Sequence, residues 1–405
     1  MAKSLLVQKG VTYPKHYCSV ALCCPSRGNL WTGHMLHNTN VTDVSAPYGG
    51  YPKVVSAGWN DNYLPPWMQD AGYNTYYVGK LWNSHTEQIY NKPYVRGFNG
   101  SDFLLDPWTY RYYYARMTRN GQPPVNYNGN YSIDIIADKA AGFFDEALKL
   151  DRPWMLTVAS NAPHANGSHS PERDATWFGR PEYAPRHANL FNHHTAPRDA
   201  SFNKLVDGAV SWFENIPELS QKEIDYIDLF QRCRLRALQA VDDLIERLID
   251  KLEKVGELDN NYIFYSTDNS HHLGQHRMQP GKNCGFGKFV LNARVLPVLI
   301  TTETDINVPL IVRGPGLPEN QTFDAVTSHT DLAPTFLSLP KLQGRDSMEK
   351  LSRGYYGPAI RMRRRNMSPS RTGFWLCLRV STAMLATRTT KSATATKTIL
   401  IRESG

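Results

Sequence analysis

The sequence predicts an α/β fold with a large, mostly parallel central sheet flanked by helices. Three short runs rich in β-branched and aromatic residues, at 73–78, 154–159 and 262–266, are typical of buried strands. Two segments with apolar residues at helical spacing, 132–150 and 221–255, precede the second and third runs. Strands that alternate with helices favour parallel pairing, and they place functional loops at the ends of the strands.

Glycine and proline mark the short elements near the N-terminus. Residues 5–10 are typical of the end of a helix, with Gly10 just beyond its last turn. Pro65 and Pro66 fit the first turn of a second helix, because proline lacks the N–H group that this turn leaves unpaired. This second helix leads into the first predicted strand.

The later elements follow the same rules. Ser132 is the predicted N-cap of the first long helix, and Gly256 ends the second one. Residues 308–312 form a further predicted strand. Residues 165–220, rich in His, Pro, Asn and Arg, are predicted to form a long irregular insertion over the sheet.

Composition and charge exclude several classes of protein. The 405 residues are 41% hydrophobic and carry a net charge of +8. Residues 341–405 contain 14 of the 45 Lys and Arg residues and 3 of the 37 Asp and Glu residues, so residues 1–340 have a net charge of −3. A nearly neutral body argues against a nucleic-acid partner. No apolar run approaches the ~18 residues of a membrane span.

The most informative stretch is Cys-Cys-Pro-Ser-Arg at 23–27, followed by Leu-Trp-Thr-Gly at 30–33. Pro25 favours the first turn of a helix, whose free N–H groups attract an anion, and Arg27 adds a planar cation. The six cysteines include no Cys-x-x-Cys pair and no zinc-ligand spacing. The stretch therefore favours a modified nucleophile, with a small buried cysteine pair as the alternative.

This stretch resembles the signature of the sulfatase family, in which the first cysteine is oxidised to formylglycine. Further motifs follow in family order and are similar to the fungal arylsulfatase and N-acetylglucosamine-6-sulfatase branch. They are HNTNVTDV at 37–44, PYGGY at 47–51, GYNTYYVGKL at 72–81, APH at 162–164, STDN at 266–269, QPGK at 279–282 and VPLIVRGPG at 308–316. The resemblance covers residues 4–286 and 305–339 and implies an alkaline-phosphatase-like fold.

The resemblance implies hydrolysis of a sulfate ester of the arylsulfatase type. Cys23 would become formylglycine and hydrate to a geminal diol; one hydroxyl attacks sulfur, the alcohol leaves, and the second hydroxyl expels sulfate by re-forming the aldehyde. Arg27 would orient the diol, Lys80 and Lys282 would bind sulfate oxygens, and His164 would contact sulfate or help proton transfer. The implied substrate is an aryl sulfate or a sulfated sugar, and the implied protein partner is the formylglycine-generating enzyme.

By the same resemblance, Asp268 and Asn269 are two oxygen ligands of a divalent cation, usually Ca²⁺ in this family. The family's other aspartate ligands lie on a first strand upstream of Met1. We therefore expect this strand to be missing and the metal site to be incomplete. Ser270 also replaces the glycine that usually follows the Asp-Asn pair, and His34 stands where the first signature usually ends in Lys or Arg.

Two segments depart from the family pattern. Residues 287–304 form an atypical insertion, and the resemblance stops near residue 341. We predict a catalytic domain at 1–340 and a basic, low-complexity, disordered tail at 341–405 in place of the family's C-terminal subdomain. We interpret the two segments as errors in the predicted gene, a retained intron for the insertion and a frameshift for the tail. The alternative is that they are a genuine surface loop and a genuine disordered tail.

Sequons are compatible with a secretory lineage. The acceptor asparagines are Asn40, Asn99, Asn130, Asn166, Asn320 and Asn366. The resemblance implies a secreted or lysosome-like location, although the N-terminal residues show no signal peptide.

Three alternatives accompany the sulfatase hypothesis. One is a phosphomonoester or phosphonate hydrolase of the same superfamily, which would share the overall site. Another is a catalytically inactive fragment. The expected loss of the first-strand aspartate ligands favours this alternative. The third is a zinc site, suggested by the loosely spaced His271, His272 and His276.

Overall fold

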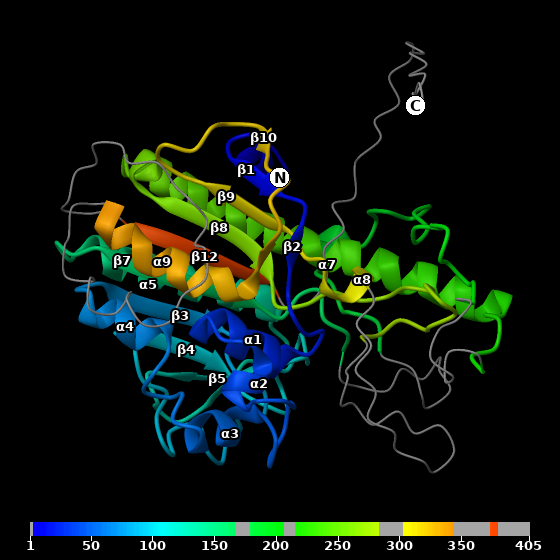
Figure 1. The fold of residues 1–405 in the computed structure, drawn as a ribbon, viewed down its shortest axis with the longest axis horizontal. Coiled ribbons are helices and arrows are strands. Elements are labelled where there is room, and N and C mark those ends of the chain that lie inside the picture. Colours follow the sequence, from blue (N-terminus) through cyan, green and yellow to red (C-terminus); the bar gives the residue numbers. More distant parts are fainter. Residues whose placement is uncertain (1–2, 167–178, 206–214, 283–302, 343–372, 380–405) are drawn as a thin grey trace, which may run out of the picture.

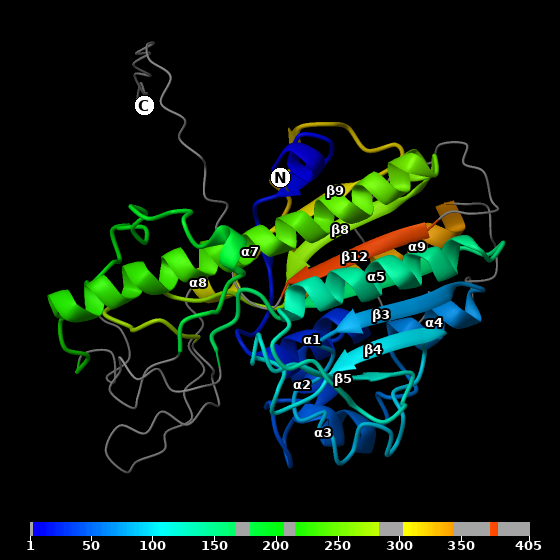
Figure 2. The same ribbon diagram turned by 180° about the vertical axis from the view of Figure 1, so that it is seen from behind.

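A ten-stranded sheet lies at the centre of the described structure, with helices on both faces (Figures 1 and 2). The computed structural model describes residues 3–166, 179–205, 215–282, 303–342 and 373–379. The strand order is β10-β1-β9-β8-β12-β7-β3-β4-β5-β6. The bounds are β1 Val11–Tyr13, β3 Asn74–Gly79, β4 Gly100–Leu104, β5 Arg116–Arg119, β6 Val125–Asn126, β7 Trp154–Ser160, β8 Tyr262–Thr267, β9 Leu310–Arg313, β10 Gln321–Thr322 and β12 Gly373–Arg379.

The middle of the sheet is parallel. Strands β8, β12, β7, β3 and β4 all run in one direction, whereas β9, β5 and β6 pair antiparallel with their neighbours. A second, small sheet pairs β2 (His16–Tyr17) with β11 (Thr327–Ser328). The predicted α/β fold with a mostly parallel sheet is confirmed, and the carboxyl ends of five neighbouring strands meet at one edge.

Each face of the sheet has its own hydrophobic core. In β3, Tyr76 and Val78 point to the core shared with α5 and α7, whereas Tyr77 points to the opposite core and packs near Trp31. This alternation follows from the two-residue period of a strand. The helices are α1 Cys23–Thr32, α2 Leu36–Thr39, α3 Gly50–Ser56, α4 Leu64–Asp70, α5 Ser132–Leu148, α7 Gln221–Lys254, α8 Glu303–Ile306 and α9 Leu332–Leu342.

The starts of the two long helices are stabilised in different ways. Helix α7 begins with a capping box, in which the side chains of Ser220 and Glu223 each bind the other residue's backbone N–H. The prediction that Ser132 caps α5 is wrong, because Tyr131 is the N-cap residue and it makes no side-chain cap. The hydroxyl of Ser132 instead lies 3.0 Å from Asn161 Oδ1, so it joins α5 to the loop after β7.

Gly10 is needed for a different reason than the sequence suggested. The segment before it forms a single π-helical turn, Lys3–Val7, and Gly10 is not in the left-handed region expected of a residue that ends a helix. A Cβ atom at this position would lie 2.4 Å from the carbonyl oxygen of Val312. Glycine is therefore required by the close approach of the chain to β9.

Part of the expected disordered tail is a strand. Residues 373–379 form β12, which lies between β7 and β8 and pairs in parallel with both. The expectation of disorder throughout 341–405 is thus wrong for this segment, because backbone pairing in a sheet does not depend on the composition of the flanking residues. Residues 343–372 and 380–405 of the predicted tail, and residues 287–302 of the predicted insertion, lie outside the described residues, whereas Glu303 and Thr304 belong to α8.

Truncation after residue 342 is expected to destabilise the protein, because it removes both parallel ladders of β12 and exposes the edges of β7 and β8. We expect earlier thermal unfolding and more light scattering than in a chain truncated after residue 379, which keeps β12. Equal unfolding temperatures for the two truncated chains would show that β12 contributes nothing to the sheet.

A buried histidine makes stability sensitive to acid. His85 packs against Tyr51 and Phe103, with ring centroids 4.5 and 5.7 Å away, and its Nε2 lies 3.2 Å from the carbonyl oxygen of Tyr90. Burial lowers the pKa of His85 to about 4. The unfolded chain therefore binds this proton below about pH 6.5, whereas the folded chain does not until about pH 4.

The free energy of unfolding should consequently fall as the pH drops from about 6.5 to about 4, by up to about 1.4 kcal/mol per pH unit for this one group. Urea titrations at several pH values measure how the free energy of unfolding depends on pH. In His85→Gln, the contribution of this histidine to that dependence should disappear. His193→Gln, at an exposed position, should keep it. An unchanged slope in His85→Gln would contradict the assignment.

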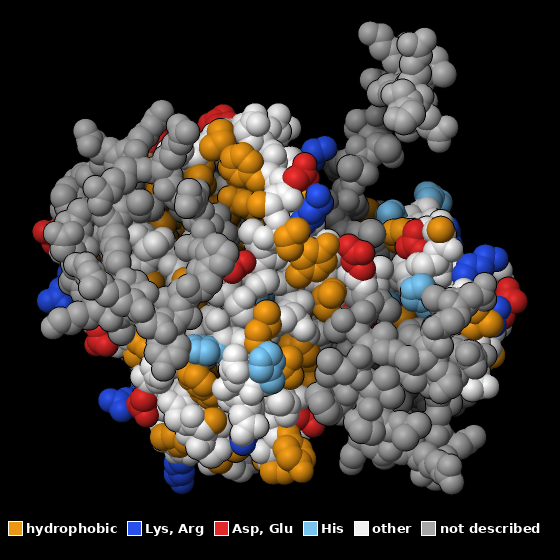
Figure 3. All heavy atoms as spheres, in the orientation of Figure 1, with side chains coloured by type: hydrophobic (Ala, Val, Ile, Leu, Met, Phe, Trp, Pro, Cys, Tyr) orange, Lys and Arg blue, Asp and Glu red, His pale blue; other side chains and the backbone are white. Residues whose placement is uncertain are grey.

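The described residues on one face of the molecule form no basic patch. On the face shown in Figure 3, the Lys and Arg side chains of the described residues are scattered among Asp and Glu side chains. Within the part of the chain that the structure describes, no helix combines the length and the apolar character needed to cross a membrane.

Candidate active site

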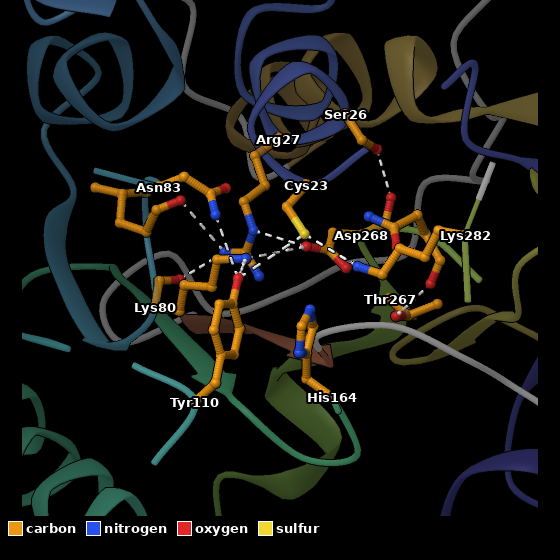
Figure 4. A network of polar contacts seen from close by, with 12 residues as sticks. Cys23, Ser26, Arg27, Lys80, Asn83, Tyr110, His164, Thr267, Asp268 and Lys282 are labelled. Carbon is orange, nitrogen blue, oxygen red and sulfur yellow. Dashed lines mark hydrogen bonds and ion pairs between the residues drawn. The ribbon is translucent and has the colours of Figure 1, made fainter. Parts of the chain in front are cut away.

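The predicted site residues come from separate parts of the chain and meet at the carboxyl edge of the sheet (Figure 4). Cys23 is the first residue of α1. Lys80 follows β3, His164 lies in the loop after β7, and Asp268 directly follows β8. Because these strands are parallel, residues that follow them gather at one edge. Lys282 reaches the same place from the loop after β8.

A buried ion pair lies beneath the site. Arg27 Nε is 2.9 Å from Asp268 Oδ2, and both side chains are fully buried. The Arg27 guanidinium also donates to the carbonyl oxygen of Lys80 and to the hydroxyl of Tyr77. Burial by itself would raise the pKa of Asp268, but the charges of Arg27, Lys80 and Lys282 lower it, so Asp268 is ionised.

The positive charges of the site act on Cys23. Its Sγ lies 3.1 Å from Lys282 Nζ, and His164 lies next to it. Burial would raise the pKa of the Cys23 thiol, but the charges of Lys282 and Lys80 outweigh burial and hold the pKa well below its usual value. The surroundings therefore stabilise negative charge at this position.

Lys80 is held by an aromatic hydroxyl. The Lys80 Nζ donates to the hydroxyl of Tyr110, and it lies 3.9 Å from Asp268 Oδ2. The amide nitrogen of Asn83 donates to the same hydroxyl at 3.3 Å. Burial lowers the pKa of Lys80, and the charges of Cys23 and Asp268 partly offset this effect. The charges of Lys80 and Lys282, both buried, thus act together on Cys23.

His164 has a defined orientation. Its ring stacks on Tyr110 with centroids 3.8 Å apart. Its Nδ1 lies 2.8 Å from the carbonyl oxygen of Ala165 and must donate to it, because a carbonyl only accepts. Burial, together with the charge of Lys282, lowers the pKa of His164. The neutral ring therefore keeps its basic lone pair on Nε2, the nitrogen that remains for Cys23.

Asp268 and Asn269 fit part of a cation site. Both side chains are fully buried, and the two polar atoms of the Asn269 amide have no hydrogen-bond partner. A buried amide oxygen beside a carboxylate suits a hard cation, but Ca²⁺ takes six to eight oxygen ligands. Among the described residues, no group of three or more His, Cys, Asp and Glu side chains could hold a metal ion. Asp268 and Asn269 would therefore supply two of the ligands that such a site needs.

The histidines of the alternative zinc site have other roles. His272 Nδ1 lies 3.0 Å from Asp305 Oδ2, in a buried pair. His271 packs edge-on against His164, with ring centroids 6.2 Å apart. Because no metal-binding group of this kind occurs in the described part of the chain, the zinc alternative has no structural support there.

The sequence analysis did not identify two groups of residues at the site. Tyr110 and Asn83 hold Lys80, as described above. Behind Asp268, His329 Nε2 donates to the carbonyl oxygen of Thr267 at 2.9 Å and lies 3.2 Å from that of Asp268. His329 Nδ1 in turn lies 3.0 Å from His16. No short motif marks these residues, since each is defined only by contacts between distant segments.

The structure also separates the glycosylation candidates. Asn40, Asn99, Asn130 and Asn320 are exposed, whereas Asn366 lies outside the described residues. Asn166 is buried, and its amide nitrogen donates to Glu182. Burial makes Asn166 a less accessible acceptor than the four exposed asparagines, and glycosylation at each sequon stays a prediction.

Comparison with known protein families identifies the chain. A family model described as Sulfatase matches residues 2–341. The chain belongs to the sulfatase family. It is 37% identical over 343 residues to an arylsulfatase from Volvox carteri, which covers 82% of the chain and 50% of that protein. It is 30% identical over 352 residues to human N-acetylglucosamine-6-sulfatase, covering 83% and 56% respectively. The chain thus spans about half the length of these sulfatases.

Solved structures show the same fold. One is a protein in complex with its substrate D-glucosamine-2-N,6-O-disulfate, with a TM-score of 0.61 and 23% identity over 83% of this chain and 70% of that one. Another is a phosphonate monoester hydrolase from Silicibacter pomeroyi, with a TM-score of 0.52 and 19% identity over 84% and 67%. These likenesses confirm the alkaline-phosphatase-like sulfatase fold expected from the sequence. Members of the sulfatase family generally use a divalent cation.

Proposed function

We propose that this chain hydrolyses sulfate esters with a formylglycine nucleophile derived from Cys23. The convergence of Lys80, Lys282 and His164 on Cys23, at the N-terminus of a helix, is the observation that carries the proposal. Cations, helix N–H groups and a neutral histidine together suit a nucleophile that attacks a monoanionic ester.

The proposed reaction has two steps. A hydroxyl of the hydrated aldehyde at position 23 attacks sulfur, the ester S–O bond breaks, and the alcohol leaves with a proton. The second hydroxyl then loses its proton, the C–O bond to sulfate breaks, and the aldehyde re-forms. His164 Nε2 would take this proton, because Nδ1 is committed to the carbonyl of Ala165.

The cations have distinct parts in this proposal. Lys282 and Lys80 would bind the non-bridging sulfate oxygens and stabilise the charge that grows on them. Arg27 would hold Asp268 and orient the diol; its Nη2 is buried without a hydrogen-bond partner in the structure and can donate to a hydroxyl at position 23. Asp268 and Asn269 would hold a divalent cation, Ca²⁺ in this proposal, which would supply further charge neutralisation when bound.

The test is turnover of 4-nitrophenyl sulfate against 4-nitrophenyl phosphate, by protein co-expressed with a formylglycine-generating enzyme and supplied with Ca²⁺. We expect a higher kcat/KM for the sulfate ester. Preference for the phosphate or a phosphonate would support the phosphohydrolase alternative, for which the fold alone provides an argument.

The inactive-fragment alternative rests on the incomplete cation site. With only two ligands from the described residues, we expect Ca²⁺ to bind weakly, with a dissociation constant of about 10⁻⁴ M or higher. Calorimetric titration with Ca²⁺ measures this directly, and Asn269→Ala should weaken it further. Submicromolar binding would show that the remaining ligands are present.

By family resemblance, we also propose a secretory location and glycans at the exposed sequons.

A further inference from the structure

Tyr110 lies at the proposed active site, but the proposed reaction gives its hydroxyl no part. It belongs to the loop between β4 and β5, and its ring stacks on His164 with an angle of 16° between the two planes. Lys80 Nζ lies 4.9 Å from the centre of the same ring. The Tyr110 hydroxyl points toward Cys23 and lies 4.0 Å from its Sγ (Figure 4). One side chain thus contacts the proposed base, a proposed sulfate-binding lysine and the proposed nucleophile.

The partners of the Tyr110 hydroxyl determine where its hydrogen points. A phenol hydroxyl has one hydrogen to donate and two lone pairs that accept. Lys80 Nζ and the amide nitrogen of Asn83 both donate to this hydroxyl, so they occupy its lone pairs. The hydrogen is then left for Cys23 Sγ, the acceptor that the described residues provide. Burial, and next the charge of Cys23, raises the pKa of Tyr110 well above its usual value, so the hydroxyl keeps this hydrogen.

Asn83 is held in place by a segment that lies earlier in the sequence. Its carbonyl oxygen accepts a hydrogen bond from the backbone N–H of Tyr51 at 2.8 Å. The backbone N–H of the next residue, Ser84, donates to Asp106 Oδ2 at 2.6 Å. The PYGGY motif at 47–51 therefore contributes to the site, because it fixes the backbone from which the Asn83 amide reaches Tyr110.

The loop that carries Tyr110 is joined to the loop that carries His164. The amide nitrogen of Asn161 donates to the carbonyl oxygen of Thr109 at 3.0 Å, and the Tyr112 hydroxyl donates to the carbonyl oxygen of His164 at 2.7 Å. Contacts on both sides of Tyr110 thus fix its position relative to the histidine. A donor that is held in this way needs little reorganisation when charge develops in front of it.

We propose that Tyr110 is a further catalytic residue, whose hydroxyl donates a hydrogen bond to one oxygen of the hydrated aldehyde at position 23. The hydrate carries two hydroxyl groups on the carbon that bears Sγ in cysteine. Holding one of them fixes the rotation of this group, so that the other faces the substrate. The same hydrogen bond stabilises the charge on the held oxygen when its proton leaves in the second step. This inference rests on the proposed hydrolysis by an aldehyde derived from Cys23.

Tyr110→Phe tests the proposal, because it removes the hydroxyl and keeps the ring that stacks on His164. At equal aldehyde content, we expect kcat for 4-nitrophenyl sulfate to fall about 10- to 100-fold. KM should stay within about threefold, because both lysines that would bind sulfate remain. If Tyr110 only packed against its neighbours, the folded variant would keep its kcat.

Tyr113→Phe is the matched control. Tyr113 lies in the same loop, is also half-buried, and its hydroxyl donates to the carbonyl oxygen of Tyr183 at 3.0 Å. Its loss removes one comparable hydrogen bond away from Cys23. We expect kcat within about twofold of the unmutated protein.

The unconverted protein provides a second readout, which needs neither the aldehyde nor turnover. A donor to Cys23 Sγ stabilises the thiolate, so its removal should raise the pH at which alkylation of Cys23 by iodoacetamide is half-maximal. We expect a rise of about one pH unit in Tyr110→Phe and no change in Tyr113→Phe. Peptide mass spectrometry with fragmentation distinguishes Cys23 from Cys24.

An unchanged kcat or an unchanged alkylation midpoint in folded Tyr110→Phe would overturn the proposal. If that variant does not fold, Asn83→Asp decides: its carboxylate would accept the Tyr110 hydrogen and turn it away from position 23, so kcat should fall at least about tenfold. An unchanged kcat in Asn83→Asp would also overturn the proposal. Absence of turnover in the unmutated protein would count against the proposed function itself, and the alkylation midpoint would then still show whether the hydroxyl contacts position 23.

Discussion

Replacing Cys23 with alanine is expected to lower the turnover of 4-nitrophenyl sulfate by about 10⁴-fold or more, because it removes the atom that becomes the nucleophile. Cys24→Ala should leave turnover within about tenfold of the unmutated protein. Cys24 is fully buried in the core beside α4, and burial raises the pKa of its thiol to about 12. Cys24 is thus a neutral packing residue, whereas Lys282 and His164 face Cys23.

The two variants control for each other, since both remove one buried thiol from the same helical turn. Circular dichroism and thermal unfolding should show that both fold. Equal loss of turnover in two folded variants would assign no special role to Cys23, and full turnover in Cys23→Ala would remove it from the mechanism.

Arg27→Leu is expected to lower the free energy of unfolding by about 3–5 kcal/mol, because it leaves the buried carboxylate of Asp268 without its main partner. The same change should abolish turnover, since Asp268 would no longer be held in place. Urea denaturation measures the first effect and the 4-nitrophenyl sulfate assay the second.

Arg247→Leu provides the comparison. Arg247 pairs with Asp138 at 2.5 Å, but the two side chains are 49% and 71% exposed, so the expected loss is within about 1 kcal/mol. If Arg27→Leu unfolds at the same urea concentration as Arg247→Leu, then the Arg27–Asp268 pair does not support the fold as proposed.

Much of the fold could be predicted because its signals are local. The strands β3, β7 and β8 are short apolar runs, and α7 has both a helical pattern and a capping sequence. The site residues could be proposed because each lies in a short motif, and the parallel strands then bring those motifs together. Their chemical roles remain predictions.

The parts that could not be predicted depend on contacts between distant segments. Tyr110 is one of 22 tyrosines, and only its position between Lys80 and His164 sets it apart. The pairing of β12 with β7 and β8 joins residues far apart in the chain. The hydroxyl of Ser132 was assigned to its own helix because the sequence does not show that Asn161 lies next to it.

The central claim is that an aldehyde formed from Cys23 hydrolyses sulfate esters. The most direct measurement is the rate of 4-nitrophenyl sulfate turnover in preparations whose aldehyde content at position 23 varies, as determined by peptide mass spectrometry. Co-expression with different amounts of a formylglycine-generating enzyme provides this variation. With Ca²⁺ supplied throughout, the rate should rise in proportion to the aldehyde fraction and fall to zero without it. A rate independent of that fraction, or no turnover in a fully converted preparation, would contradict the claim.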